Sequence, residues 1–132
     1  MAQRLVGDGI KKITIIDITE GRLSEALSSL TNIDSSAQVL KIGCDCSSEE
    51  AVELAVQETV KKFGRLDVCF NAAGMSGEPG VIADQSTQNL DAVLGLNLRG
   101  VWLCERAQIK QMMKQEMRDV MQVLTFGENS CW

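Results

Sequence analysis

The stretch best suited to approach a ligand is Asn71-Ala72-Ala73-Gly74, which directly follows the apolar run 68–70. Asn71 carries an amide that can both donate and accept hydrogen bonds and so brace a turn, and the next three residues have almost no side chain. In α/β sheets, ligands bind beyond the carboxyl ends of the strands, where such a turn lets the backbone come close. Asparagine and glycine also end strands without any ligand, so this stretch alone leaves both interpretations open.

The cysteine pair Cys44 and Cys46 offers less chemistry. The chain has no histidine and no second pair with this spacing, so a zinc site is not expected and no metal ligand is predicted. The pair also lacks the two-residue spacer of the usual redox motif. We interpret both as packing residues at a strand end. Five cysteines, an odd number, with no secretory pattern at the N-terminus, indicate reduced thiols and a cytoplasmic location.

Composition limits the class of protein. The chain has 132 residues, 45% apolar and 23% charged, which suits one globular domain with a core. The net charge of −5 argues against nucleic acid or an anionic membrane as the main partner. No run approaches the roughly 18 apolar residues of a membrane span, so no membrane partner is expected.

The elements that position these residues alternate between helix and strand. A short helix at 1–6 precedes apolar runs at 13–17, 39–42 and 68–70 that predict strands, and helical periodicity fills the intervals between them. This rhythm indicates parallel strands in an α/β fold. The segment 31–37 is polar and predicted to be a loop. Between the second and third strands, Ser47 and Glu50 form a predicted capping box, and Gly64 is the predicted helix end.

A long helix is predicted from a cap at Ser86 or Thr87 to about Glu116. Asn97 falls within its apolar stripe, where a buried amide without partners costs ~1–3 kcal/mol; on the residues alone, it is best read as bonding to a helix kink. Gly95 and Gly100 weaken a helix and predict close packing. The expected inner stripe consists of Leu90, Val93, Leu94, Leu98, Val101 and Trp102.

The ordered set of Asp17, Asp45, Asn71–Gly74 and Asn97–Gly100 resembles the short-chain dehydrogenase/reductase family. The resemblance covers about residues 1–116. It implies an incomplete Rossmann-type, doubly wound parallel sheet in three αβα layers, occupying residues 1–119. The remainder, 120–132, is a divergent tail in which 120–126 is a weak predicted strand and 127–132 has no partner pattern. The implied activity is hydride transfer between a nicotinamide dinucleotide and an alcohol or ketone.

The resemblance also implies a role for each matched residue. Asp17 accepts hydrogen bonds from the adenosine ribose hydroxyls, and its charge would repel a 2′-phosphate, so NAD is favoured over NADP. Asp45, with the backbone of Cys46 beside it, contacts the adenine amine. Asn71, Ala72, Ala73 and Gly74 brace the central sheet beside the cofactor. Asn97 is the active-site asparagine, the only catalytic residue of the family pattern that is present, and helps to hold a proton-relay water.

Two parts of the family pattern are missing, and we therefore expect a fragment truncated at both ends. A Gly-rich phosphate loop would lie ~20 residues before Asp17, which is beyond the first residue. The chain contains no tyrosine, so the general acid of the family's Tyr-x-x-x-Lys is absent, and Lys110 and Lys114 are interpreted as surface charges. We expect impaired cofactor binding, no catalysis and marginal stability, because the missing first strand would lie between strands 13–17 and 67–70.

Two other functions stay open. A non-catalytic interaction protein would dock through the helix at 87–116 onto a second copy or a full-length relative, with Trp102, Met112, Met113 and Met117 on its surface. These residues are equally consistent with a core position. A flavodoxin-like binding module of the same class requires a phosphate loop after a first strand, and the sequence offers none.

Overall fold

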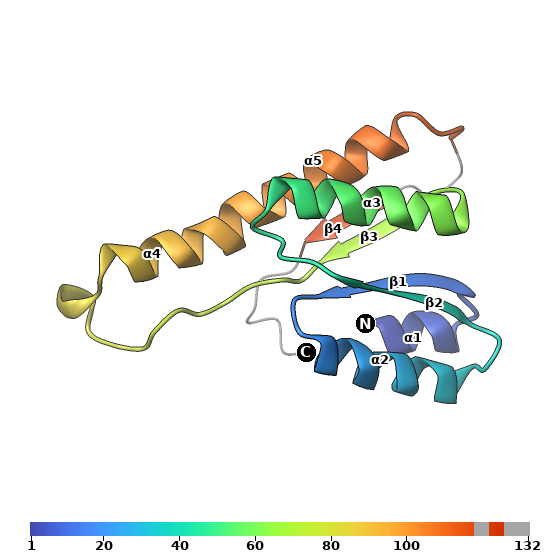
Figure 1. Cartoon of the computed structure of the whole chain (residues 1–132), viewed down its shortest axis with the longest axis horizontal. Coiled ribbons are helices and arrows are strands. Elements are labelled where there is room, and N and C mark those ends of the chain that lie inside the picture. The colour runs from blue at the N-terminus through green and yellow to red at the C-terminus, as the bar shows by residue number, and fades with distance from the viewer. Residues whose placement is uncertain (118–121, 126–132) are drawn as a thin grey trace.

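The computed structural model describes residues 1–117 and 122–125, in which helices and strands alternate as the sequence predicts (Figure 1). Two elements are short helical segments of other types: η1 is a single 3-10 turn, and η2 is a π-helical segment that connects α4 to α5. In chain order the elements are α1 (Ala2–Gly7), β1 (Lys12–Asp17), α2 (Glu20–Ile33), β2 (Gln38–Gly43), α3 (Glu49–Phe63), β3 (Val68–Asn71), η1 (Ile82–Asp84), α4 (Thr87–Leu94), η2 (Gly95–Gly100), α5 (Val101–Met112) and β4 (Gln122–Thr125).

The strands form two parallel pairs, which confirms the predicted α/β class. Asp17 at the carboxyl end of β1 lies opposite Gly43 of β2, and Asn71 at the carboxyl end of β3 lies opposite Thr125 of β4. Within the described residues, no hydrogen-bonded ladder connects β1 to β3, so the sheet consists of two halves. The facing edges of β1 and β3 therefore carry backbone groups that no strand of the described chain pairs.

Helices cover both faces of these strands and make the predicted three layers. Figure 1 shows α1 and α2 on one face and α3 and α5 on the other. The Thr59 hydroxyl of α3 donates to the Thr14 hydroxyl of β1 at 3.1 Å, which ties one layer to the next. The rod formed by α4, η2 and α5 runs beyond the strands, so that α4 projects away from the layered body (Figure 1).

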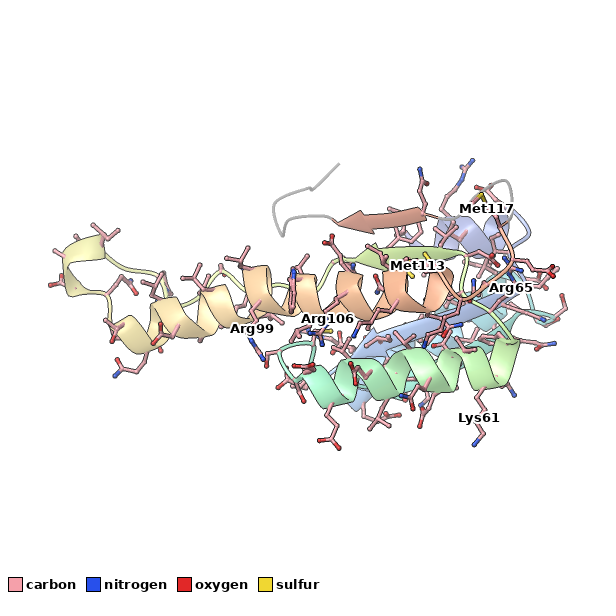
Figure 2. All side chains as sticks on the ribbon, turned by 90° about the horizontal axis from the view of Figure 1, so that it is seen from above. Lys61, Arg65, Arg99, Arg106, Met113 and Met117 are labelled. Carbon is pink, nitrogen blue, oxygen red and sulfur yellow. The ribbon has the colours of Figure 1, made fainter. Side chains whose placement is uncertain are left out.

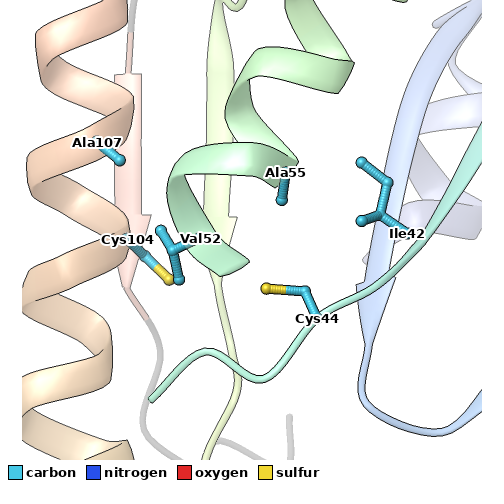
Figure 3. Packing of buried hydrophobic residues seen from close by; sticks show 6 residues of the cluster. All are labelled: Ile42, Cys44, Val52, Ala55, Cys104 and Ala107. Atoms are coloured by element: carbon cyan, nitrogen blue, oxygen red, sulfur yellow. The ribbon is translucent and has the colours of Figure 1, made fainter. Parts of the chain in front are cut away.

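The core has one part on each face of the strands. Under α1 and α2, Val6, Leu23 and Leu30 are 2% exposed or less, which agrees with the helical periodicity predicted between the first two strands. Between α3, α5 and the end of β2, a second cluster joins elements far apart in the sequence (Figure 3). It consists of Ile42, Cys44, Val52, Ala55, Cys104 and Ala107.

The cap of α3 lies one residue later than predicted. The Ser48 side chain accepts a hydrogen bond from the Ala51 N–H at 3.4 Å and is therefore the N-cap. Ser47 instead donates its hydroxyl to Asp45 at 2.7 Å, so its oxygen serves the preceding turn. The predicted end of this helix is confirmed, because Gly64 adopts the left-handed conformation with φ of 87°.

The end of α2 and the start of the C-terminal part can also be compared with the sequence prediction. α2 continues to Ile33, so the loop predicted from residue 31 is wrong there; the Thr31 hydroxyl donates to the Leu27 carbonyl at 3.0 Å and is satisfied within the helix. The predicted weak strand is present as β4 in its described part. The end at 127–132 lies outside the described residues, and the division between 1–119 and the tail stays a prediction.

The predicted inner stripe of the long helix is wrong. Leu90, Leu94, Leu98 and Trp102 are exposed by 54%, 46%, 67% and 55%, and Asn97 is exposed as well. A π-helical turn contains one residue more than an α-helical turn. Residues that regular helical spacing would place on one face of α4 and α5 are therefore shifted after η2, and α5 buries a different face from the one predicted. The buried residues of η2 and α5 are Gly100, Leu103, Cys104, Ala107 and Met112.

The two glycines of η2 differ in their surroundings. A β-carbon added to Gly100 would lie 3.0 Å from the carbonyl oxygen of Cys46, which confirms the close packing predicted there. A β-carbon added to Gly95 would have open space around it: apart from its own helix backbone and chain neighbours, no atom of the described residues lies within 4 Å. Close packing therefore does not explain this glycine.

Candidate functional site

The carboxyl ends of the strands bring the predicted site residues to one end of the molecule. All the strands point the same way in Figure 1. Asp17 ends β1, and its carbonyl accepts a hydrogen bond from the Cys44 N–H at 3.2 Å, so the loop that carries Asp45 begins beside it. Asn71 ends β3, and the small residues that follow leave the sheet at the same end.

Asp17 both closes a turn and keeps an oxygen available. Its Oδ1 accepts a hydrogen bond from the Thr19 N–H at 2.7 Å, which fixes the start of α2. Its Oδ2 lies 3.9 Å from Nη1 of Arg22, whose side chain is 74% exposed. Arg22 was not predicted from the sequence. Its position in the first turn of α2, just after the strand that ends at Asp17, could have indicated that it lies near that carboxylate. The pair presents a carboxylate and a guanidinium together at the carboxyl end of β1.

Asp45 holds its own loop in shape. Its Oδ1 accepts hydrogen bonds from the Ser47 N–H at 2.9 Å and the Ser47 hydroxyl at 2.7 Å, and these bonds lower the pKa of the Asp45 carboxyl. Arg99 of η2 donates from Nη1 to the Ser47 carbonyl at 2.8 Å, which fastens the loop to the long helix (Figure 2). Cys46 is half-buried behind this loop.

The side chain of Asn71, whose amide was predicted to brace the turn, bonds to the helix α5 instead. This side chain is buried, with 8% exposed, and exchanges two hydrogen bonds with the amide of Gln108 in α5, at 3.0 and 2.8 Å. The amide therefore joins β3 to α5, and the contacts shown do not brace the turn itself. Gln108 was missed because it lies far along the chain with no local signal. Ala72 and Ala73 are exposed and Gly74 is half-buried, so their backbone is open to approach.

Asn97 fixes the residue that follows this turn. Its Oδ1 accepts from the Met75 N–H at 2.9 Å, and its Nδ2 donates to the Met75 carbonyl at 2.8 Å. This double contact imitates a strand pair and ties the loop after Gly74 to η2. Because both ends of the amide are used on Met75, Asn97 has a positioning role in this structure.

A hollow of about 440 Å³ lies between the loop after β2, the loop after β3 and the long helix. It brings Asp45, Met75 and Arg99 together, whereas Asp17 and Asn71–Gly74 are not among its lining residues. Within residues 1–117 and 122–125, no cluster of histidine, cysteine or acidic side chains is arranged to hold a metal ion. No helix in that part of the chain is long and apolar enough to cross a membrane. The residues that line the hollow are Asp45, Ser47, Met75, Asp91, Ala92, Gly95, Leu96 and Arg99.

Comparison with known proteins agrees with this architecture. The family model described as short chain dehydrogenase matches residues 1–125. Levodione reductase from Leifsonia aquatica is 31% identical over 126 residues, covering 96% of this chain and 47% of its own length. Short-chain dehydrogenase reductase 3a from Arabidopsis thaliana is 34% identical over 99 residues, covering 75% of this chain and 37% of its own.

Solved structures show the same similarity. The crystal structure of levodione reductase superposes with a TM-score of 0.87 at 31% identity, over 94% of this chain and 46% of that one. NAD⁺-bound xylitol dehydrogenase gives a TM-score of 0.85 at 28% identity, over 94% of this chain and 45% of that one. The chain thus spans less than half the length of these relatives, and its strands and helices form part of their Rossmann-like fold. It belongs to the short-chain dehydrogenase family.

Proposed function

We propose that this chain forms the adenosine-facing half of the nucleotide site of an NAD(P)-dependent oxidoreductase, and that on its own it binds the nucleotide weakly and does not catalyse hydride transfer. The observation that carries the proposal is the convergence of Asp17, the Asp45 loop and the Asn71–Gly74 turn at the carboxyl ends of parallel strands. The reaction of the family is hydride transfer between nicotinamide and an alcohol or ketone. We expect the chain in the cytoplasm, where its thiols stay reduced.

Each residue has a chemical part in this proposal. Oδ2 of Asp17, which has only the ion pair with Arg22 at 3.9 Å, accepts hydrogen bonds from the ribose hydroxyls, and the Asp45 loop, with the backbone of Cys46, faces the adenine. The exposed backbone of Ala72 and Ala73 allows a flat ligand to lie against the turn. Asn97 keeps that turn in place through Met75.

Asp17 also carries the proposed preference for NAD. A second negative charge on a ribose 2′-phosphate would be repelled by this carboxylate, so NADP binds less well. Arg22, 3.9 Å away, acts in the opposite sense, because a guanidinium attracts phosphate. We expect the repulsion of the 2′-phosphate by Asp17 to outweigh its attraction by Arg22, because Asp17 lies at the strand end and is held in place by the Thr19 N–H.

Binding tests the proposal directly. Saturation-transfer NMR on the adenine and ribose protons detects weak binding, and NAD is expected to bind the chain more tightly than NADP. Asp17→Asn should weaken NAD binding by about 10-fold or more, since hydrogen bonds to a charged group contribute ~1.5–3 kcal/mol. Asp84→Asn, an exposed acid in η1, is the matched control and should leave binding unchanged. Absence of NAD binding, or equal binding by Asp17→Asn, would contradict the proposal.

A second function is favoured by the surface of the long helix. Six large apolar side chains along α4, η2 and α5 are exposed, here called the apolar stripe, and monomeric proteins rarely expose large contiguous apolar patches. We propose that this stripe docks onto a second copy of the chain or a full-length relative. Its members are Leu90, Leu94, Leu98, Trp102, Ile109 and Met113.

Charge reversal of the stripe tests docking. Trp102 is 55% exposed and stacks under the Arg106 guanidinium, 4.8 Å from its ring centre, so Trp102→Glu places a carboxylate in the middle of the stripe. We expect this change to abolish co-purification with a full-length relative and self-association. Ile33→Glu at the end of α2, where Ile33 is 46% exposed on the opposite layer, should leave both intact. A chain that is strictly monomeric and captures no relative would exclude this function.

A further inference from the structure

Three cysteine side chains gather where the loop after β2 packs against α5. Cys44 is 5% exposed and Cys104 is 9% exposed, and the partly exposed Cys46 packs against the same cluster. Figure 3 shows the Cys44 and Cys104 side chains directed toward Val52, one from the end of β2 and the other from α5. All three are free thiols. The sequence motif that singled out Cys44 and Cys46 gave no hint of Cys104, which is far along the chain.

The backbone brings Cys46 onto the face of the long helix that carries Cys104. Cys104 follows Gly100 by four residues, and helical residues four apart lie on the same face. A β-carbon on Gly100 would lie 3.0 Å from the carbonyl oxygen of Cys46. Arg99 holds the same loop by donating to the Ser47 carbonyl at 2.8 Å. Contacts that involve neither sulfur therefore hold Cys46 and Cys104 next to each other.

The pKa values of the three thiols are shifted in different directions. Hydrogen bonding by Cys104 lowers the pKa of Cys46, as does that by Cys44, while burial and the carboxylates of Asp45 and Asp17 act in the opposite direction. The pKa of Cys104 is raised by its bond to Cys46 and by burial, and burial raises the pKa of Cys44 to about 11. Cys46, the half-buried member of the cluster, thus has a lowered pKa beside two thiols whose pKa values are raised, and the thiolate is the nucleophilic form.

We propose that Cys46 and Cys104 are an oxidation site that closes into a reversible disulfide when the chain meets a hydroperoxide. The Cys46 thiolate attacks the terminal peroxide oxygen, the O–O bond breaks, and the leaving alkoxide takes a proton from water, which yields a sulfenic acid on Cys46. The Cys104 sulfur then attacks the sulfenic sulfur, and its proton leaves with the hydroxide as water. Two thiols are oxidised to one disulfide, and the hydroperoxide is reduced to an alcohol and water. No nucleotide takes part in this reaction, so its test does not depend on whether the chain binds a nucleotide.

Peptide mapping of the whole chain tests this site. The reduced protein is treated with hydrogen peroxide, remaining thiols are alkylated, and the digest is analysed by mass spectrometry. We expect Cys46 and Cys104 to disappear from the alkylated pool and to appear as one linked peptide, with Cys69 still alkylated. Dithiothreitol should restore both thiols. Cys46→Ser and Cys104→Ser should each abolish the linked peptide, whereas the control Cys69→Ser, at another buried thiol, should keep it.

Several outcomes would overturn the proposal without relying on the variants. One is a sulfinic acid on Cys46 with Cys104 still alkylated, because the second thiol would then not trap the first product. Another is a disulfide between Cys44 and Cys46. A third is the same distribution of linked peptides from the chain oxidised in denaturing urea, since the pairing would then not come from the fold.

Discussion

Leu103→Ala is expected to remove most of the cooperative structure of this protein. Leu103 is 2% exposed and is among the largest fully buried side chains, on the face of α5 that packs inward. Truncation of a buried leucine costs about 2–5 kcal/mol through lost burial and the cavity left behind. Domains typically have only about 5–15 kcal/mol of unfolding free energy in total, and we expect the unpaired edges of β1 and β3 to keep this chain at the low end of that range. The measurement is urea unfolding followed by circular dichroism.

Leu98→Ala is the matched control for this substitution. Leu98 is the same residue type in the same rod, five positions earlier, but is 67% exposed. An exposed substitution changes stability by about 0.5 kcal/mol or less. Equal losses from the two variants would contradict the assignment of the buried face. The wild-type curve in the same series tests the two-part sheet, because a sharp transition with a slope normal for the chain's size would contradict marginal stability.

The purified chain is expected to leave NADH unconsumed in the presence of aldehydes and ketones. Reduction of a carbonyl needs a proton delivered to the developing alkoxide, and a positioned general acid contributes about 10²- to 10⁴-fold to the rate. The chain contains no tyrosine to supply that proton, and Lys110 and Lys114 have no such partner. Asn97, the one residue that the resemblance assigns to the active site, uses both ends of its amide to hold Met75.

The assay follows NADH fluorescence over hours at high protein concentration, with a full-length relative and its own substrate as the positive control. We expect the rate to equal that of buffer with NADH alone. A substrate-dependent rate above this background would refute the proposed inactivity. It would leave the family membership in place, because that rests on the match over residues 1–125.

Much of the fold was predictable because local patterns agree with the tertiary structure. The apolar runs at 13–17, 39–42 and 68–70 are strands, and Gly64 ends α3 with the positive φ that glycine allows. The stripe of the long helix was not predictable in the same way. Regular helical spacing assumes one period throughout, whereas η2 inserts a wider turn between α4 and α5.

In the candidate site, too, features set by neighbouring residues were predictable from the sequence, whereas contacts between distant residues were not. Asp17 and Asp45 were recognisable at strand ends, and each also accepts a hydrogen bond from a backbone N–H two residues later, as turn residues do. The pairing of Asn71 with Gln108 was not recognisable, because an amide pair between a strand and a distant helix leaves no periodic trace in the sequence. Only the packing of α5 across β3 brings the two side chains into register.

The break between β1 and β3 has a consequence for how copies of this chain meet. Two molecules that each lend a strand to fill the break in the other would form a closed dimer, because the exchange is then reciprocal. One-way exchange would instead leave one break open at the end of every assembly, so that growth would rise with concentration and yield assemblies of undefined length. A population of uniform size would therefore indicate reciprocal exchange or a filler that is not itself split in the same way.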